Sequence, residues 1–94
     1  MKLNDSDLKR LRFQAIKYQK DRLCDLFDKG GNKNFHTYNM LIVLAAIHPL
    51  LVEKVITPEE EKRLSQMCKG TVEDVNLVHQ ILLTKIDEAL NELL

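Results

Sequence analysis

The apolar run at residues 40–52, MLIVLAAIHPLLV, constrains the fold of this 94-residue chain more than any other stretch. It holds 13 residues and includes a His-Pro pair, whereas a helix needs about 20 apolar residues to cross a bilayer. Such a run in a chain that is 30% charged is typical of the central helix of a soluble domain. We expect its own neighbours to bury it, so that any activity is carried by outer surfaces and not by an interior pocket.

Length and charge favour a single domain without net charge, spanning residues 1–94. The 14 Lys and Arg residues balance the 14 Asp and Glu residues, which argues against a generic binder of polyanions. Residues 1–36 carry nine basic and five acidic side chains, whereas residues 37–94 carry five basic and nine acidic ones. We expect the two halves to complement each other electrostatically, within one fold or across a dimer.

The two cysteines, Cys24 and Cys68, lie far apart and show no CxxC or CxxH spacing. A chain of this length does not need a disulfide, so we expect reduced thiols and a cytoplasmic protein. The sequence MKLNDSDLKRL at the N-terminus is charged and has no apolar segment of the kind found in signal peptides. No secretory signal or membrane anchor is therefore expected.

The first half of the chain predicts two helices. Asn4, Asp5 and Ser6 can cap a helix over residues 7–29, and Gly30-Gly31 can end it. A second helix is expected to start near Phe35 or Thr37 and to run through the apolar segment. Pro49 lacks a backbone donor and disfavours helical geometry at the residue before it. We expect this second helix to be kinked there or split into two.

The second half of the chain carries two further helix starts. Thr57-Pro58-Glu59-Glu60 combines an N-cap, a proline at the first helical position and a capping-box glutamate, and the helix it starts is expected to end at Gly70. Thr71 followed by Asp74 predicts a fourth helix that runs to the C-terminus. No segment alternates with a period of two. The predicted fold is an all-α bundle of four helices, with a fifth if the second helix is broken.

The last predicted helix has one broad apolar stripe, which we assign to the core: Val72, Val75, Leu82, Leu83, Ile86, Ala89, Leu90 and Leu93. His79 lies within this stripe and is interpreted as a core residue. Leu77 and Ile81 project from a different side and are one turn apart, so they contact each other. Either the preceding helix covers them, or they form an apolar contact for a partner chain or a homodimer.

The first predicted helix is apolar over more than half of its circumference. One stripe is formed by Leu8, Leu11, Ala15, Tyr18 and Leu26, with Ile16, Leu23 and Phe27 beside it. A further face carries Arg10, Phe13, Lys17, Lys20 and Cys24 at spacings of three and four. An exposed aromatic ring between cations could bind an acidic protein surface or a nucleic-acid backbone. The same pattern also occurs on ordinary solvated faces, where lysine stems cover apolar side chains.

Residues 27–41, FDKGGNKNFHTYNML, resemble a degenerate EF-hand. If Asp28 is the first loop position, the apolar eighth position is Phe35, as the motif requires. The sixth position, however, is Lys33 instead of Gly, and the twelfth is Asn39 instead of a bidentate Glu. The resemblance therefore does not imply calcium binding.

The remaining motifs favour a protein without chemistry of its own. His36, His48 and His79 lie on separate elements without metal-ligand spacing, and neither a nucleophile motif nor a phosphate loop is present. The last helix is too acidic for a DNA recognition helix. We expect no enzyme, no metal and no cofactor.

The sequence thus predicts a small helical protein-binding module that acts as a regulator, inhibitor or adaptor of a larger protein with an acidic patch. Phage- and plasmid-encoded inhibitors and immunity proteins are analogous in size and class. The residues predicted to bind the partner are Arg10, Phe13, Lys17, Lys20, Leu77 and Ile81. The alternatives are nucleic-acid binding through the basic face of the first helix, or a structural role as a subunit of an oligomer.

Overall fold

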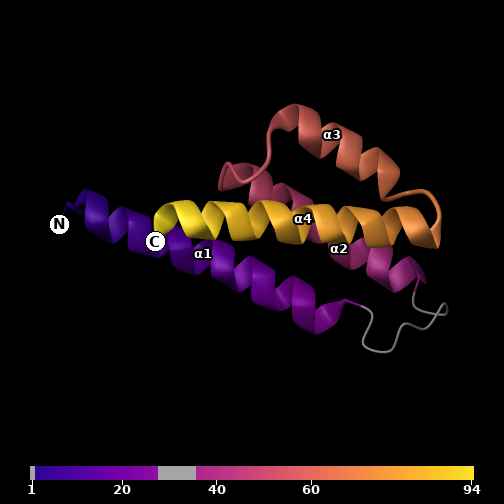
Figure 1. Cartoon of the computed structure of the whole chain (residues 1–94), viewed down its shortest axis with the longest axis horizontal. Coiled ribbons are helices and arrows are strands. Elements are labelled where there is room, and N and C mark those ends of the chain that lie inside the picture. Colours follow the sequence, from indigo (N-terminus) through magenta and orange to yellow (C-terminus); the bar gives the residue numbers. More distant parts are fainter. Residues whose placement is uncertain (1, 28–35) are drawn as a thin grey trace.

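The computed structural model describes residues 2–27 and 36–94, which form four α-helices (Figure 1). In chain order these are α1 (Asp5–Leu26), α2 (His36–Val52), α3 (Pro58–Met67) and α4 (Val72–Leu93). Within the described ranges there is no strand. The predicted all-α class and the arrangement of four helices are therefore confirmed.

Side-chain caps fix the starts of three helices. The Asn4 side chain accepts a hydrogen bond from the backbone N–H of Asp7, so α1 begins two residues before the predicted position. Thr57 and Thr71 each accept a hydrogen bond from the backbone N–H three residues later, and the acidic side chain at that position accepts one in return. These two capping boxes satisfy amides that a helix leaves without internal partners, and they confirm the predicted starts of α3 and α4.

Two of the helices end earlier than predicted. Helix α1 ends at Leu26 and Phe27 is extended, whereas the Gly30-Gly31 stop signal lies outside the described residues. Helix α3 ends at Met67 instead of reaching Gly70, because the chain tightens into a turn in which the Gly70 N–H donates to the Met67 carbonyl.

Helix α2 continues through Pro49 to Val52, so a fifth helix is not formed there. Proline removes only the hydrogen bond to the carbonyl four residues earlier, which here belongs to Ala45. Because Pro49 lies one turn from the end of the helix, little of the helical ladder is lost. The next residues then close the helix: Lys54 has a φ of 61°, and the N–H of Val55 donates to the Leu50 carbonyl, as in a Schellman motif.

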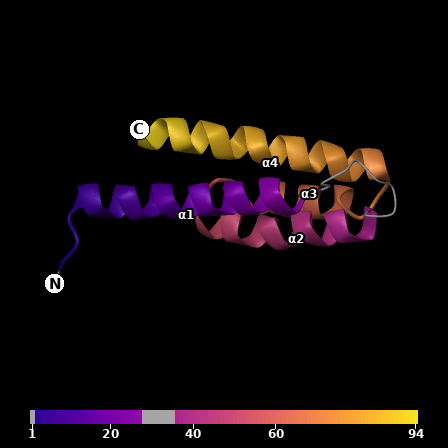
Figure 2. The same ribbon diagram turned by 90° about the horizontal axis from the view of Figure 1, so that it is seen from below.

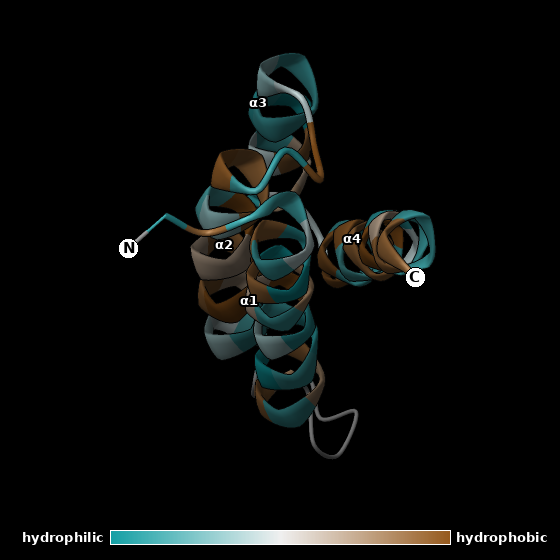
Figure 3. Cartoon of the chain, turned by 90° about the vertical axis from the view of Figure 1, so that its left-hand side faces the viewer, coloured by the Kyte–Doolittle hydropathy of each residue, from teal (hydrophilic) through white to brown (hydrophobic). Residues whose placement is uncertain are grey.

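Helices α1, α2 and α3 lie side by side in a row, and α4 packs against one side of this row (Figures 1 and 3). Helix α2 lies between α1 and α3. Helices α1 and α4 contact each other along much of their length (Figure 2). The opposite side of the row has no helix on it in the described part of the chain (Figure 3).

The core is aliphatic and lies where α4 meets the row. Ile16 and Leu23 of α1 are buried there, and Cys68 is buried at the end of α3. The predicted stripe of α4 is confirmed, since each of its members is buried or packs against the core except Val72, which is half-buried. Val78 of α4 is also fully buried.

The expectation that the apolar segment is buried on every side is wrong for α2. Leu41 is 55% exposed and Val52 is 63% exposed, and Ala45 between them is exposed as well. The reason is the architecture: α1, α3 and α4 contact three sides of α2, and no helix in the described residues packs on the fourth side.

Candidate protein-binding surface

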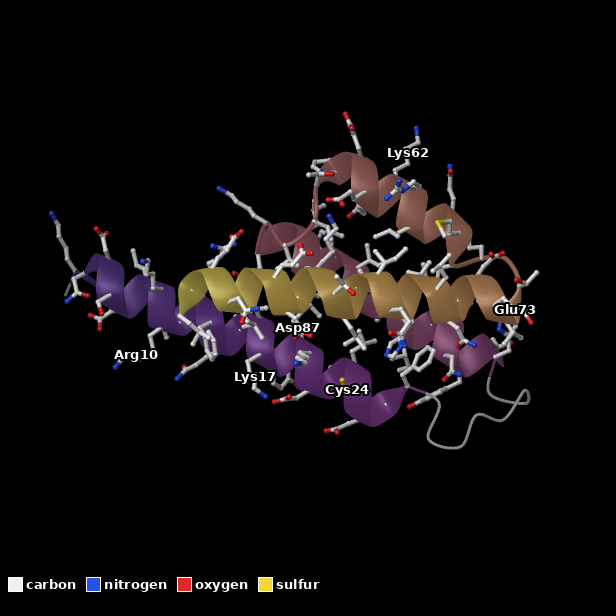
Figure 4. All side chains as sticks on the ribbon, in the orientation of Figure 1. Arg10, Lys17, Cys24, Lys62, Glu73 and Asp87 are labelled. Atoms are coloured by element: carbon white, nitrogen blue, oxygen red, sulfur yellow. The ribbon has the colours of Figure 1, made fainter. Side chains whose placement is uncertain are left out.

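The predicted cationic ridge on α1 is largely neutralised by its own helix. Arg10 lies 3.1 Å from a carboxylate oxygen of Asp7. Lys17 lies 2.8 Å from a carboxylate oxygen of Asp21. Arg10 and Lys17 project from one edge of α1 into solvent (Figure 4). Paired cations present less net charge to an acidic partner or to a phosphate backbone than the sequence pattern implies.

The other two residues of the predicted ridge contribute to the fold. Lys20 donates a hydrogen bond of 2.7 Å to Asp87 of α4, and this bond raises the pKa of Lys20. Phe13 is half-buried and packs against the core, so the expectation of an exposed aromatic ring between cations is wrong. Phe13 lies three residues before the buried Ile16, which places it on the side of α1 that meets the core. The Lys20–Asp87 pair joins the basic and acidic halves of the sequence.

The two residues of the predicted contact on α4, Leu77 and Ile81, have different environments in the structure. Leu77 is 50% exposed, whereas Ile81 is half-buried and packs against the core. Leu77 precedes Asp87, which pairs with Lys20, by ten residues, or about 15 Å of helix. The ridge on α1 and the contact on α4 therefore do not form one surface.

A different surface emerges on the uncovered side of the row. On α1, Leu11, Tyr18 and Arg22 lie within about 40° of one another and roughly opposite Lys20, which faces α4. On α2, the outward residues lie opposite the buried Val43 and Leu50 in the same way. We call this surface the α1–α2 face; its exposed residues are Leu11, Tyr18 and Arg22 of α1, and Tyr38, Leu41, Ala45, His48 and Val52 of α2.

A small pocket lies in the groove between α1 and α2, next to this face. Its volume is about 130 Å³, and it is lined by Gln19, Arg22, Leu23, Ile42, Ala45, Ala46 and Pro49. Pro49 leaves the Ala45 carbonyl without its helical donor at this place. Ligand pockets usually measure about 300 to 1,000 Å³. The pocket therefore suits a single side chain of a partner better than a whole metabolite.

The sequence carried little signal for the α1–α2 face. Periodicity finds the buried side of a helix by contrast with a polar side, and the apolar segment of α2 is apolar all round. The polar residues of α2 do not mark its solvent-exposed side consistently, because Asn39 is buried and His48 is exposed. On α1, Leu11 and Tyr18 belong to the apolar stripe that the sequence showed, but they face solvent.

The potentially reactive side chains Cys68 and His79 are packed inside the fold. The Cys68 thiol donates to the Met40 carbonyl at 3.6 Å, and burial raises its pKa to about 11, so it stays protonated. His79 stacks on Phe27 with ring centroids 3.8 Å apart, and burial lowers its pKa. Both cysteines are free.

No group of three or more His, Cys, Asp or Glu side chains within residues 2–27 and 36–94 is placed to hold a metal ion. Most of the EF-hand-like segment, including Asp28, Lys33 and Phe35, lies outside the described residues. Its last position, Asn39, is buried in α2.

None of the helices in the described part of the chain is long and apolar enough to cross a membrane. Comparison of the chain with protein-family models, with curated proteins and with solved structures found no match. The fold and its exposed apolar face therefore define the protein only as a helical bundle with one uncovered side.

Proposed function

We propose that this chain is a non-catalytic, cytoplasmic protein-binding module, which acts as a regulator, inhibitor or adaptor by covering part of another polypeptide with its α1–α2 face. The proposal depends chiefly on one observation: the most apolar helix of the protein exposes Leu41 and Val52 on its outer side. Burying one such side chain is worth roughly 1.5 to 3 kcal/mol. Contiguous apolar side chains on an otherwise charged surface are typical of a protein contact.

The shape of the face fits this use. Helix α2 has 17 residues and is about 26 Å long, and two packed helices are roughly 20 Å wide. This is the scale of a standard interface, which buries about 800 Å² on each partner. The pocket beside Pro49 offers a place for one anchoring side chain, and Arg22 at its rim makes no ion pair with any described residue. Arg22 is therefore available to contact an aromatic ring or a carboxylate of the partner.

Nucleic-acid binding through α1 has less support. That alternative needs cations free to neutralise phosphates, and Arg10, Lys17 and Lys20 each have a carboxylate within 3.1 Å.

The test compares three variants of the tagged chain by quantitative capture of associated protein from its native cells. Leu41→Asp places a charge on the α1–α2 face, and we expect it to reduce the captured partner more than tenfold, since about 1.4 kcal/mol corresponds to a factor of ten. Leu77→Asp is the matched control, because Leu77 is similarly exposed but lies on α4. Lys17→Glu tests the ridge predicted from the sequence.

The proposal expects the Leu77 and Lys17 variants to capture the partner as the unaltered chain does, with circular dichroism confirming that all three are folded. If Lys17→Glu abolishes capture and Leu41→Asp leaves it unchanged, the α1–α2 face is not the contact surface.

A further inference from the structure

We infer that the occupant of the α1–α2 face is a second copy of this chain, related by a two-fold axis that passes Ala45 and sets the two α2 helices antiparallel. The inference rests on the proposed function of that face, and it names the partner. It would make the protein a homodimer whose two exposed apolar surfaces cover each other.

The outward side of α2 is compatible with such a dimer. A two-fold interface brings the same patch of both copies together, so residues at equal distances on either side of the axis meet. Tyr38 and Val52 lie seven residues before and after Ala45, and Leu41 and Pro49 lie four residues before and after it. Each pair would place two apolar side chains in contact. Ala45, the smallest residue of the face, lies where the two helices must approach most closely.

The same register seats Leu41 in a complementary site. Ala45, His48, Pro49 and Val52 have the spacing i, i+3, i+4 and i+7, which forms the hole that receives one side chain in knobs-into-holes packing. Leu41 of one copy lies opposite this hole in the other copy. Two of its four residues, Ala45 and Pro49, also line the pocket between α1 and α2, so the hole continues into an existing depression. The arrangement occurs twice, once for each copy.

The first helix is compatible with this axis. The Arg12 guanidinium donates to the Glu53 carbonyl, and Gln19 and Ala46 line the same pocket, so the antiparallel α1 and α2 are in register at these levels. Lys20 on α1 then lies at the same level as Ala45 on α2. Tyr18, two residues before Lys20, and Arg22, two residues after it, are both exposed. The axis brings Arg22 of each copy to the Tyr18 ring of the other, where a guanidinium can stack on the aromatic face.

The net charge of the chain does not oppose the association. The chain has a formal net charge of zero at pH 7, so two copies do not repel each other at long range. The exposed residues of α2 on the face include no Lys, Arg, Asp or Glu. A partner selected by charge would need complementary charges here, whereas a second copy needs only a matching apolar surface.

Disulfide trapping tests the register. In a Cys24→Ser background, Ala45→Cys places two thiols at the axis, and we expect mild oxidation of the purified chain to give a covalent dimer on a non-reducing gel. Val52→Cys is the matched control. Its two thiols would be about 21 Å apart along the helices, whereas a disulfide needs Cα atoms within about 7 Å. Cys68 is buried, with a pKa of about 11, and does not compete. Equal cross-linking of both variants, or of Val52→Cys alone, overturns the antiparallel register.

Sedimentation equilibrium of the purified chain gives the second readout. We expect the unaltered chain and Leu77→Asp to sediment at twice the chain mass of 10.9 kDa, and Leu41→Asp to sediment at that mass. An unaltered chain that remains monomeric up to about 100 µM, well above the micromolar affinities of typical weak complexes, overturns the homodimer. In that case, loss of a different captured protein by Leu41→Asp would still support the proposed function. Failure of both experiments would remove both proposals.

Discussion

His79 shows how one residue can be placed correctly by the sequence and still carry an unexpected property. Its position in the apolar stripe of α4 predicted a core residue, and the ring is half-buried and stacked on Phe27 with an angle of 4° between the planes. Within the described part of the chain, its buried Nε2 atom has no hydrogen-bond partner. Desolvation lowers the pKa of His79 from its ordinary value of 6.5, because a charged imidazole is poorly solvated there.

This lowered pKa predicts a loss of stability in mild acid. Below about pH 6.5, the unfolded chain binds a proton at His79 that the folded chain does not yet bind, so the free energy of unfolding falls with decreasing pH until the folded pKa is reached. Urea unfolding at pH 7.5 and pH 5.5 measures this loss. We expect a smaller loss for His79→Gln than for the unaltered chain. His48→Gln, at an exposed position, is the control for removing an imidazole. Equal losses for His79→Gln and the unaltered chain would contradict the prediction.

At the scale of the helices, Lys54 carries the clearest local strain. It follows the end of α2 and has a φ of 61°, in the left-handed region that favours glycine. The turn is nevertheless stable, because the backbone N–H groups of Lys54 and Val55 donate to carbonyls in the last turn of α2. Lys54 itself is exposed, so its side chain contributes little to packing.

Replacing this residue therefore separates backbone strain from side-chain effects. We expect Lys54→Gly to increase the free energy of unfolding by about 0.5 to 1 kcal/mol, the difference between relief of strain and the extra entropy of glycine in the unfolded chain. Lys54→Ala removes the same side chain but keeps the strained φ, and should change the stability little. Denaturant unfolding measures both. A glycine variant less stable than the alanine variant would show that the left-handed geometry costs less than the extra entropy of glycine in the unfolded chain.

The helices also show which parts of this structure a sequence can predict. Caps depend on residues three or four apart, so Thr57 with Glu60 and Thr71 with Asp74 were sufficient to place the starts of α3 and α4. The orientation of a helix depends on which neighbours surround it, and that is decided by residues far away in the chain. Tyr18 and Phe13 show the difference, because both are aromatic residues of α1, and the structure exposes Tyr18 but packs Phe13, which the sequence placed on an exposed ridge, against the core.

For the candidate site, the same limit explains why the sequence selected a different surface from the one that the structure favours. Lys17 and Lys20 were identified by their charge, but a sequence pattern does not show that Asp87 from the other half of the chain reaches Lys20. Leu41 was identified as apolar and was therefore assigned to the core. Only the structure shows that none of the other three described helices packs on this side of α2, so that this leucine belongs to the surface.

The molecule as a whole is elongated, with principal extents of 48 × 28 × 22 Å. Part of this length comes from the first turns of α1, which project past the end of α4 (Figures 1 and 2). Residues 5–11 of α1 are exposed except for Asp7, which is half-buried. The first hydrogen bond from α1 to another element is that of Arg12 with the Glu53 carbonyl, among the described residues. The Asn4 cap and the Arg10–Asp7 ion pair thus support the projecting turns.

Hydrogen exchange should reveal this uneven support. Short helical segments without packing are only marginally stable in water, so we expect the amides of residues 9–11 to exchange at least 100-fold faster than those of Leu82 and Ile86, which are fully buried in α4. Native-state exchange followed by NMR measures these rates residue by residue. Comparable protection at both places would mean that the projecting turns are held by contacts absent from this fold.

The open side of α2 also affects how much of this protein a cell can keep. Chains that display uncovered leucine and valine tend to aggregate and are bound by chaperones and degraded, so a newly made copy is vulnerable until its surface is occupied. Abundance should then depend on how fully Leu41 and Val52 are covered, and copies left uncovered should be cleared.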